Sequence, residues 1–168
     1  MTHTPAPTQP YRLLKPGDGL VEPGPGRVTD RFMIDGPDSD QRFALVQHLL
    51  APRALAAPVH RHHLEDEFTY VLKGRVGVML GEDEVVIEPG DLLFKPRHQW
   101  HTFWNTSDEP ATVLELISPA GLEIFFRWLA ELDEFPAPDV LAVKAAPYQC
   151  DVDQAATEAL MLRLNIAG

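Results

Sequence analysis

The sequence has one cysteine, little positive charge and no long apolar run. Because Cys150 stands alone, an intrachain disulfide and a zinc site made of several cysteines are both excluded. Lysine and arginine number 14 against 25 acidic residues, so the formal charge is −11 and the pI is about 4.9. Nucleic acids and anionic membrane surfaces attract Lys and Arg, so this balance argues against both as partners.

The sequence also shows neither the pattern of a membrane span nor that of a secretory signal. No apolar run reaches the roughly 18 to 20 residues that a membrane span needs. The first residues, MTHTPAPTQPYRLL, lack the basic and then apolar regions of a secretory signal, so we expect a cytoplasmic protein. A length of 168 residues and a hydrophobic fraction of 45% suit one soluble domain with its own core and flanking segments.

The middle of the chain divides into many short segments of β type, separated by Gly, Pro, Asp and Glu turns. Short strands at this spacing favour an all-β antiparallel sandwich or barrel. The expected strands are 27–34, 43–50, 68–72, 75–80, 85–87, 92–95, 99–105 and 111–117, with a possible edge strand at 11–14.

The two flanks differ from this pattern. Residues 1–26 are rich in Pro and Gly, and we expect a mobile arm followed by a loop. Residues 27–118 would form the β domain. Residues 119–168 would form a helical extension packed outside it.

Two helices are expected in that extension. Ser118-Pro119 is typical of a helix start, and helical periodicity continues to about Glu134. Asp151 and Gln154 resemble a capping box that opens a last helix ending near Leu164.

The stretch PVHRHHLEDEFTYVLKG, residues 58–74, concentrates histidines and acids. His60 and His62 are two apart, so on a strand both imidazoles point to one side. Glu67 follows at the start of the next expected strand. Two imidazoles and a carboxylate that converge suit a divalent transition metal, and the stretch GDLLFKPRHQWHTFWN, residues 90–105, could add His101.

These two stretches resemble a known pair of motifs. They read His60-x-His62-x4-Glu67-x6-Gly74 and Gly90-x5-Pro96-x4-His101-x3-Asn105, with residues 75–89 between them. The pattern is similar to that of the cupin superfamily, in its compact single-domain (cupin 2) form, from about residue 43 to residue 117. The N-terminal loop and the segment SPAGLEIFF also resemble the quercetinase-like (quercetin dioxygenase-like) group. One departure is His98, where the second motif usually has glycine.

The resemblance implies a small β-barrel or jelly roll that holds a metal inside. Its ligands would be His60, His62, Glu67 and His101. Nitrogen and oxygen ligands without thiolate do not select among Fe, Mn, Ni, Co, Cu and Zn. The alternative is a metal-free cupin whose motif residues only line the interior. It is disfavoured because four unpaired ionisable groups are costly to bury.

Two further residues are candidates for the substrate pocket. Phe103 shares a strand face with His101 and is expected to line the pocket. His98 lies just before His101 and could act as a general base or contact the substrate at the mouth, or be a solvated turn histidine.

The other conspicuous side chains are interpreted as surface or packing residues. His63, Glu65 and Asp66 are expected to be loop and surface residues. The aromatic residues Trp100, Trp104 and Tyr70 are expected on the outer faces of strands, where a helix or a second subunit would cover them. The latter option predicts a homodimer.

The leading functional hypothesis is a metal-dependent dioxygenase or oxidoreductase that acts on a small enolisable, flavonol-like molecule. The metal would lower the pKa of the substrate, and Glu67 would be both a ligand and a transient base. The alternative is a metal-containing protein that binds or isomerises a sugar-like compound without oxygen. A ligand-sensing regulator is disfavoured because no DNA-binding helix-turn-helix accompanies the β domain.

Overall fold

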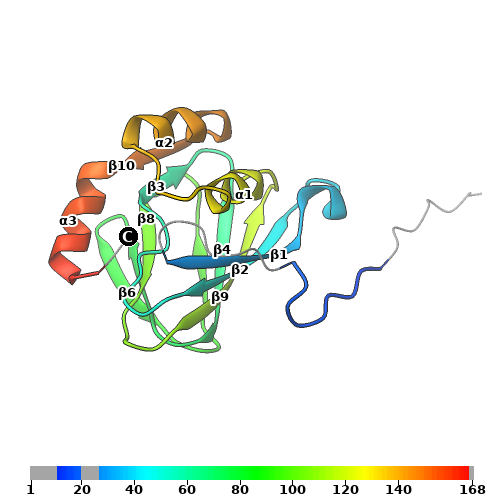
Figure 1. The fold of residues 1–168 in the computed structure, drawn as a ribbon, viewed down its shortest axis with the longest axis horizontal. Helices are drawn as coiled ribbons and strands as arrows, with labels where there is room; N and C mark the ends of the chain where they lie inside the picture. The colour runs from blue at the N-terminus through cyan, green and yellow to red at the C-terminus, as the bar shows by residue number, and fades with distance from the viewer. Residues whose placement is uncertain (1–10, 20–26, 167–168) are drawn as a thin grey trace, which may run out of the picture.

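The computed structural model describes residues 11–19 and 27–166 and contains two five-stranded antiparallel sheets (Figure 1). The strand order is β1-β2-β9-β4-β7 in one sheet and β10-β3-β8-β5-β6 in the other. The strands are β1 (Val28–Ile34), β2 (Ala44–Leu50), β3 (Val59–His62), β4 (Asp66–Lys73), β5 (Val76–Leu80), β6 (Asp83–Ile87), β7 (Leu92–Lys95), β8 (His101–Asn105), β9 (Ala111–Ser118) and β10 (Cys150–Asp153).

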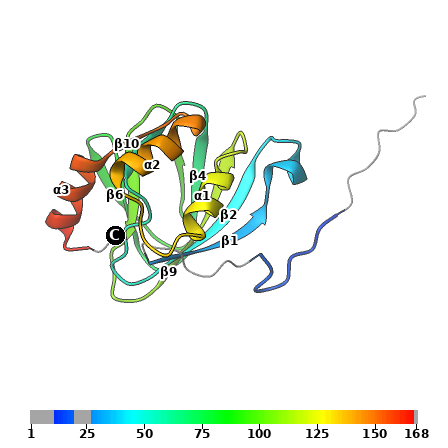
Figure 2. The same cartoon turned by 45° about the horizontal axis from the view of Figure 1, so that its top comes forward.

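Three helices follow or flank the sheets: α1 (Glu123–Ala130), α2 (Pro138–Ala145) and α3 (Gln154–Leu164). Two short 3₁₀ turns, η1 (Gly36–Ser39) and η2 (Ala146–Tyr148), complete the elements. Figure 2 shows α1 and α2 on one side of the sheets and α3 at their end. No helix in the described ranges is long and apolar enough to cross a membrane.

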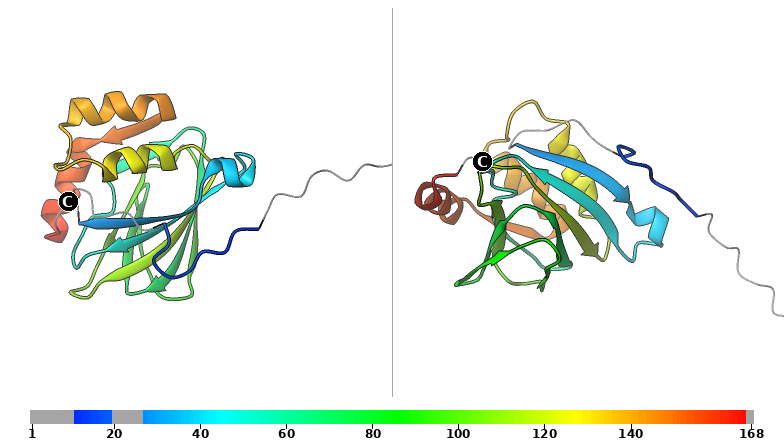
Figure 3. Two further views of the ribbon diagram at one scale, coloured as in Figure 1. Left: turned by 45° about the vertical axis from the view of Figure 1, so that its right-hand side comes forward. Right: turned by 90° about the horizontal axis from the view of Figure 1, so that it is seen from below.

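The core lies between the two sheets, because successive residues of the inner strands alternate between buried and more exposed positions. In β2 and β9 every second residue is buried, as the pleat of a strand with one inward face requires. One part of the core holds Leu50 and Val113 with Val76 and Val78 of the opposite sheet. The mostly β fold that the sequence predicted is confirmed. The two sheets are not joined into one closed barrel, which corrects the barrel expectation (Figure 3).

The helices cover apolar surface that the sheets leave open. Leu122 and Phe125, at the start of α1, pack on Phe32, Val46 and Ile117 of the sheet that contains β1. At the other sheet, Leu160 of α3 packs on Trp104, Leu55 and Val59. Trp104 is therefore covered by a helix of its own chain.

The predicted elements of the β domain are confirmed to within a few residues, whereas those of the flanks are less accurate. Tyr11 to Leu14 forms no strand and is largely exposed. The predicted arm, residues 1–10, and part of the predicted loop, residues 20–26, lie outside the described residues.

The C-terminal extension differs most from the prediction. Ser118 does not cap a helix, because it still belongs to β9, pairs with Asp66 and donates its hydroxyl hydrogen to the Arg42 carbonyl. Helix α2 and strand β10 were not predicted. The last helix begins after Asp153, whose carboxylate accepts the Ala156 N–H, rather than after Asp151.

Strand β10 makes the extension part of a sheet rather than only an outer cover. It pairs with β3, with Cys150 opposite His62 and Val152 opposite His60.

Tyr70, Leu92 and Phe94 are exposed on β4 and β7, at the edge of the first sheet. The homodimer that such apolar faces suggested stays a prediction.

Candidate metal centre

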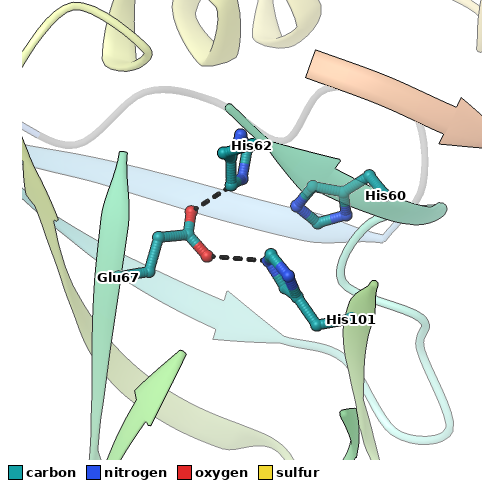
Figure 4. A group of neighbouring side chains, drawn as sticks. All are labelled: His60, His62, Glu67 and His101. Atoms are coloured by element: carbon teal, nitrogen blue, oxygen red, sulfur yellow. Dashed lines mark hydrogen bonds and ion pairs between the residues drawn. The ribbon is translucent and has the colours of Figure 1, made fainter. Parts of the chain in front are cut away.

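Four side chains from three strands converge inside the fold (Figure 4). They are the predicted ligands His60, His62, Glu67 and His101, and each is buried. One nitrogen or oxygen atom from each lies within 4.8 Å of the others. The long-range pairing of His101 with the first motif is therefore present in the structure.

The strand arrangement explains this convergence. His60 and His62 point the same way because they alternate along β3. His101 lies directly opposite His60 where β8 pairs with β3. Glu67 comes from β4, which belongs to the other sheet. The centre thus joins the two sheets across the interior.

Two imidazoles are oriented by backbone carbonyls. His60 Nδ1 lies 2.7 Å from the Pro58 carbonyl oxygen, and His101 Nδ1 lies 2.9 Å from that of Gln99. A carbonyl only accepts, so each Nδ1 carries the hydrogen and each Nε2 keeps its lone pair. Burial lowers the pKa of both rings, and for His60 the neighbouring histidines lower it well below its usual value. Neutral imidazole is the form that binds metals.

Glu67 is held as a carboxylate. Burial raises its pKa, but the positive charge of Lys95, together with the neighbouring His62 and His101, outweighs this and keeps it well below the usual range. Lys95 Nζ lies 2.8 Å from Glu67 Oε2, and His101 Nε2 lies 3.0 Å from the same oxygen.

His62 tests most directly whether these residues fit a metal. Both of its ring nitrogens are buried and make no hydrogen bond with the described residues, although Nε2 lies 3.3 Å from Glu67 Oε1. Burial lowers the pKa of His62, but the Glu67 carboxylate outweighs this and raises the pKa to about 10, so a bound metal would displace the ring proton. A buried imidazole without hydrogen bonds, beside a carboxylate and two neutral imidazoles, suits a cation. The residues therefore fit a divalent metal, whose identity the donors do not select.

An apolar cavity of about 330 Å³ opens beside this centre. His60 and Glu67 line it on the side of the four-residue cluster. Helices α1 and α3 contribute Phe126, Leu129 and Met161 to its wall. Its size is at the lower end of the range for small-molecule sites.

The two predicted pocket residues lie in different places. Phe103 is buried and lines the cavity. His98 is exposed, lies beside the ring of His63 at 5.4 Å between centroids, and is not part of the cavity wall.

The acidic loop between the first ligands differs in part from its prediction. His63 is at the surface as expected, with Nε2 2.8 Å from Asp151 Oδ2. Asp66 is half-buried and forms an ion pair with Arg97 at 2.7 Å. Glu65 is only 4% exposed, so its interpretation as a solvated charge was wrong. Burial also raises the pKa of Glu65.

Four polar residues around the centre, three of them buried and one partly buried, were not among the predicted site residues. Lys95 lies between Glu67 and Glu115, 3.1 Å from the latter. Asp30 and His48 form a pair in the cavity wall. His48 and Glu115 could have been found from the alternation of their strands. Each occupies an inward-facing position, between apolar residues two places before and after it.

Comparison with known proteins agrees with this fold. Residues 46–117 match the family model described as the cupin domain (Cupin_2). The tetracenomycin polyketide synthase protein TcmJ of Streptomyces glaucescens is 35% identical over 83 residues, which are 49% of this chain and 54% of TcmJ. The match thus spans about half the length of that curated relative.

Two solved structures are also similar. The polyketide cyclase RemF of Streptomyces resistomycificus has a TM-score of 0.55 and 29% identity, over 64% of this chain and 78% of RemF. A sugar phosphate isomerase of the cupin superfamily from Silicibacter pomeroyi has a TM-score of 0.50 and 26% identity, over 58% of this chain and 71% of the isomerase.

The domain match, the two-sheet fold and the structural neighbours support the cupin superfamily for this chain. The predicted quercetinase-like subgroup is not confirmed by them.

Proposed function

We propose that this protein is a metal-dependent enzyme that acts on a small, largely apolar ketone, which it activates by removing a proton next to the carbonyl group. The observation that carries the proposal is that two members of the His₃Glu cluster, His60 and Glu67, lie in the wall of an apolar cavity. The names of two relatives, a polyketide cyclase and a polyketide synthase protein, support a substrate with several enolisable carbonyl groups.

His60, His62, Glu67 and His101 would hold the metal. When bound, the metal would polarise the substrate carbonyl and lower the pKa of the adjacent C–H bond. The carbonyl groups of Pro58 and Gln99 would keep two imidazoles in the orientation for binding.

Glu67 is the candidate acceptor for the substrate proton, because its carboxylate reaches both the cluster and the cavity. Its low pKa makes it a weak base. Proton transfer therefore depends on acidification of the substrate. The apolar wall, with Phe103 and Phe126, excludes water around the substrate and strengthens these electrostatic effects.

Two reactions can follow from the same deprotonated ketone. In a cyclisation the carbanion carbon attacks a second carbonyl group of the same molecule, and no oxidant is needed. In a dioxygenation the carbanion reacts with molecular oxygen, which is the reaction that the sequence predicted for a flavonol-like substrate. The relatives' names favour cyclisation, and the three-histidine, one-carboxylate donor set favours dioxygenation as the second candidate.

The deciding experiment uses chelator-treated protein loaded in turn with Fe(II), Mn(II), Co(II), Ni(II) or Zn(II). Each form is supplied with a panel of aromatic β-diketones and flavonols while dissolved oxygen and products are followed. Cyclisation predicts metal-dependent product formation without oxygen uptake. Stoichiometric oxygen uptake would assign the dioxygenase reaction instead, and no metal-dependent turnover of any enolisable compound would refute the proposal.

The matched variants are Glu67→Gln and Asp66→Asn. Asp66 is the neighbour of Glu67 but pairs with Arg97 on the outside. We expect Glu67→Gln to abolish metal-dependent turnover and Asp66→Asn to preserve it.

A further inference from the structure

A second polar pair lies in the same cavity, away from the four candidate ligands. His48 Nδ1 is 2.7 Å from Asp30 Oδ1, and the two residues are directly opposite on β2 and β1. Both side chains line the cavity, although His48 is only 7% exposed. A histidine–carboxylate pair that is largely buried in an apolar wall is costly, so its presence there needs an explanation.

The environment of the ring directs its other nitrogen. Nδ1 is engaged by Asp30, and no residue in the described ranges forms a hydrogen bond with Nε2. The aromatic rings of Phe103 and Phe126 flank the imidazole, with centroids at 6.0 and 5.8 Å. They are also cavity residues, so the imidazole, with its free Nε2, forms a polar spot in an apolar wall.

We propose that the Asp30–His48 pair is the proton donor of this site, with His48 Nε2–H hydrogen-bonding to the oxygen of a ketone or enolate substrate bound in the cavity. This inference rests on the proposed function for the nature of the substrate. It assigns catalytic work to a pair that lies outside the metal cluster.

The charges around His48 support the protonated form. Burial lowers the pKa of His48, but the carboxylate of Asp30 outweighs it, and the net shift is upward. Glu115 of β9 also raises this pKa and Lys95 of β7 lowers it. The ring can therefore carry the second hydrogen near neutral pH. Asp30 holds that charged ring in place, as the carboxylate does in other histidine–carboxylate pairs.

The proton transfer balances without any further reactant. The Cα–H bond of the ketone breaks and its proton passes to Glu67, while the electron pair forms the C=C bond. The C=O π pair moves to oxygen, which takes the proton from His48 Nε2. The products are an enol, a protonated Glu67 and a neutral His48 whose Nδ1–H still donates to Asp30. The reverse steps restore all groups.

The test follows hydrogen exchange at the α-carbon of 1-tetralone, a bicyclic enolisable aryl ketone, in D₂O. The metal-loaded protein is compared with His48→Gln, Asp30→Asn and the control Gln47→Ala, and deuterium in the extracted ketone is measured by mass spectrometry. Gln47 is next to His48 but lies on the opposite face of β2, where it accepts a hydrogen bond from Arg31. We expect His48→Gln to lower the exchange rate by about 10²- to 10⁴-fold, the range for a positioned acid or base, Asp30→Asn to lower it less, and Gln47→Ala to leave it unchanged.

A pH profile separates proton donation from a structural effect. The wild-type rate should fall as the pH rises through the His48 pKa, and His48→Gln should lose this limb while it keeps the wild-type metal content. Equal pH profiles in wild type and His48→Gln would overturn the inference. Metal content and circular dichroism identify any variant that has lost its fold. If His48→Gln is such a variant, NMR of the wild-type protein decides whether His48 contacts the substrate.

A second measurement does not depend on turnover. In metal-free wild-type protein labelled with ¹⁵N-histidine, adding 1-tetralone should shift the His48 Nε2 resonance. An absent shift would overturn the inference even if the loaded enzyme is active. A clear shift without exchange activity would support the inferred contact and refute the proposed function, so the two failures are distinguishable.

Discussion

Lys95 offers a quantitative test of the electrostatics at the centre. Its side chain is fully buried, with Nζ 2.8 Å from Glu67 and 3.1 Å from Glu115. Lys95→Met preserves most of the side-chain volume but removes the ammonium group that lies between two buried carboxylates. Breaking a buried ion pair by removing one partner costs about 3 to 5 kcal/mol. For a chain of this length, that loss lowers the Tm by roughly 6 to 20 °C.

The assay is urea unfolding in the presence of chelator, followed by tryptophan fluorescence. The midpoint should fall with an unchanged m-value, because the same surface is exposed on unfolding. The double variant Lys95→Met with Glu115→Gln removes one of the two uncompensated charges and should recover part of the loss. A saturating divalent metal should stabilise Lys95→Met more than it stabilises the wild type, because the cation would replace the lost positive charge beside Glu67. A loss below about 1 kcal/mol, or a double variant less stable than the single one, would refute this reasoning.

Three further predictions concern the packing and the second polar pair. Gly77→Ala should destabilise the protein by about 1 to 3 kcal/mol and shift the tryptophan emission, because a Cβ at Gly77 would overlap the indole ring of Trp104. Leu122→Ala should cost about 2 to 5 kcal/mol in urea unfolding, because Leu122 is fully buried where α1 meets the sheet. The stability advantage of wild type over His48→Gln should be full below about pH 6.5 and should be lost as the pH rises through the raised His48 pKa, since protonated His48 is stabilised by Asp30. An advantage that grows with pH in unfolding curves would contradict the last prediction.

The β domain was predictable because its strands carry a local signal. Alternation marks Ala44–Leu50 and Ala111–Ser118, and turn residues separate the shorter strands between them. The four candidate ligands followed from two motifs and from the period of a strand. The pairing of β8 with β3 brings His101 to His60, and the packing of the two sheets brings Glu67 to both. This convergence was predicted from the resemblance to a family and not from any local pattern.

The features that the sequence did not predict, namely α2, β10 and the burial of Lys95, depend on tertiary contacts. Helix α2 was not predicted, although Pro138 stands in its first turn, where proline is favoured. Cys150–Asp153 becomes a strand because β3 has a free edge to pair with, and that edge is not visible locally. Lys95 has the composition of a surface residue, and only its two carboxylate partners on other strands explain its burial.

Metal binding by the four converging side chains is tested most directly by measuring its stoichiometry. Chelator-treated protein is incubated with Co(II), Mn(II) or Ni(II), freed of excess ion by gel filtration, and analysed for bound metal by mass spectrometry. We predict one ion per chain for the wild type and for His63→Ala, whose ring lies outside the cluster, and none for His60→Ala or His101→Ala. A wild type that retains no ion, or ligand variants that retain as much as the wild type, would contradict the central claim.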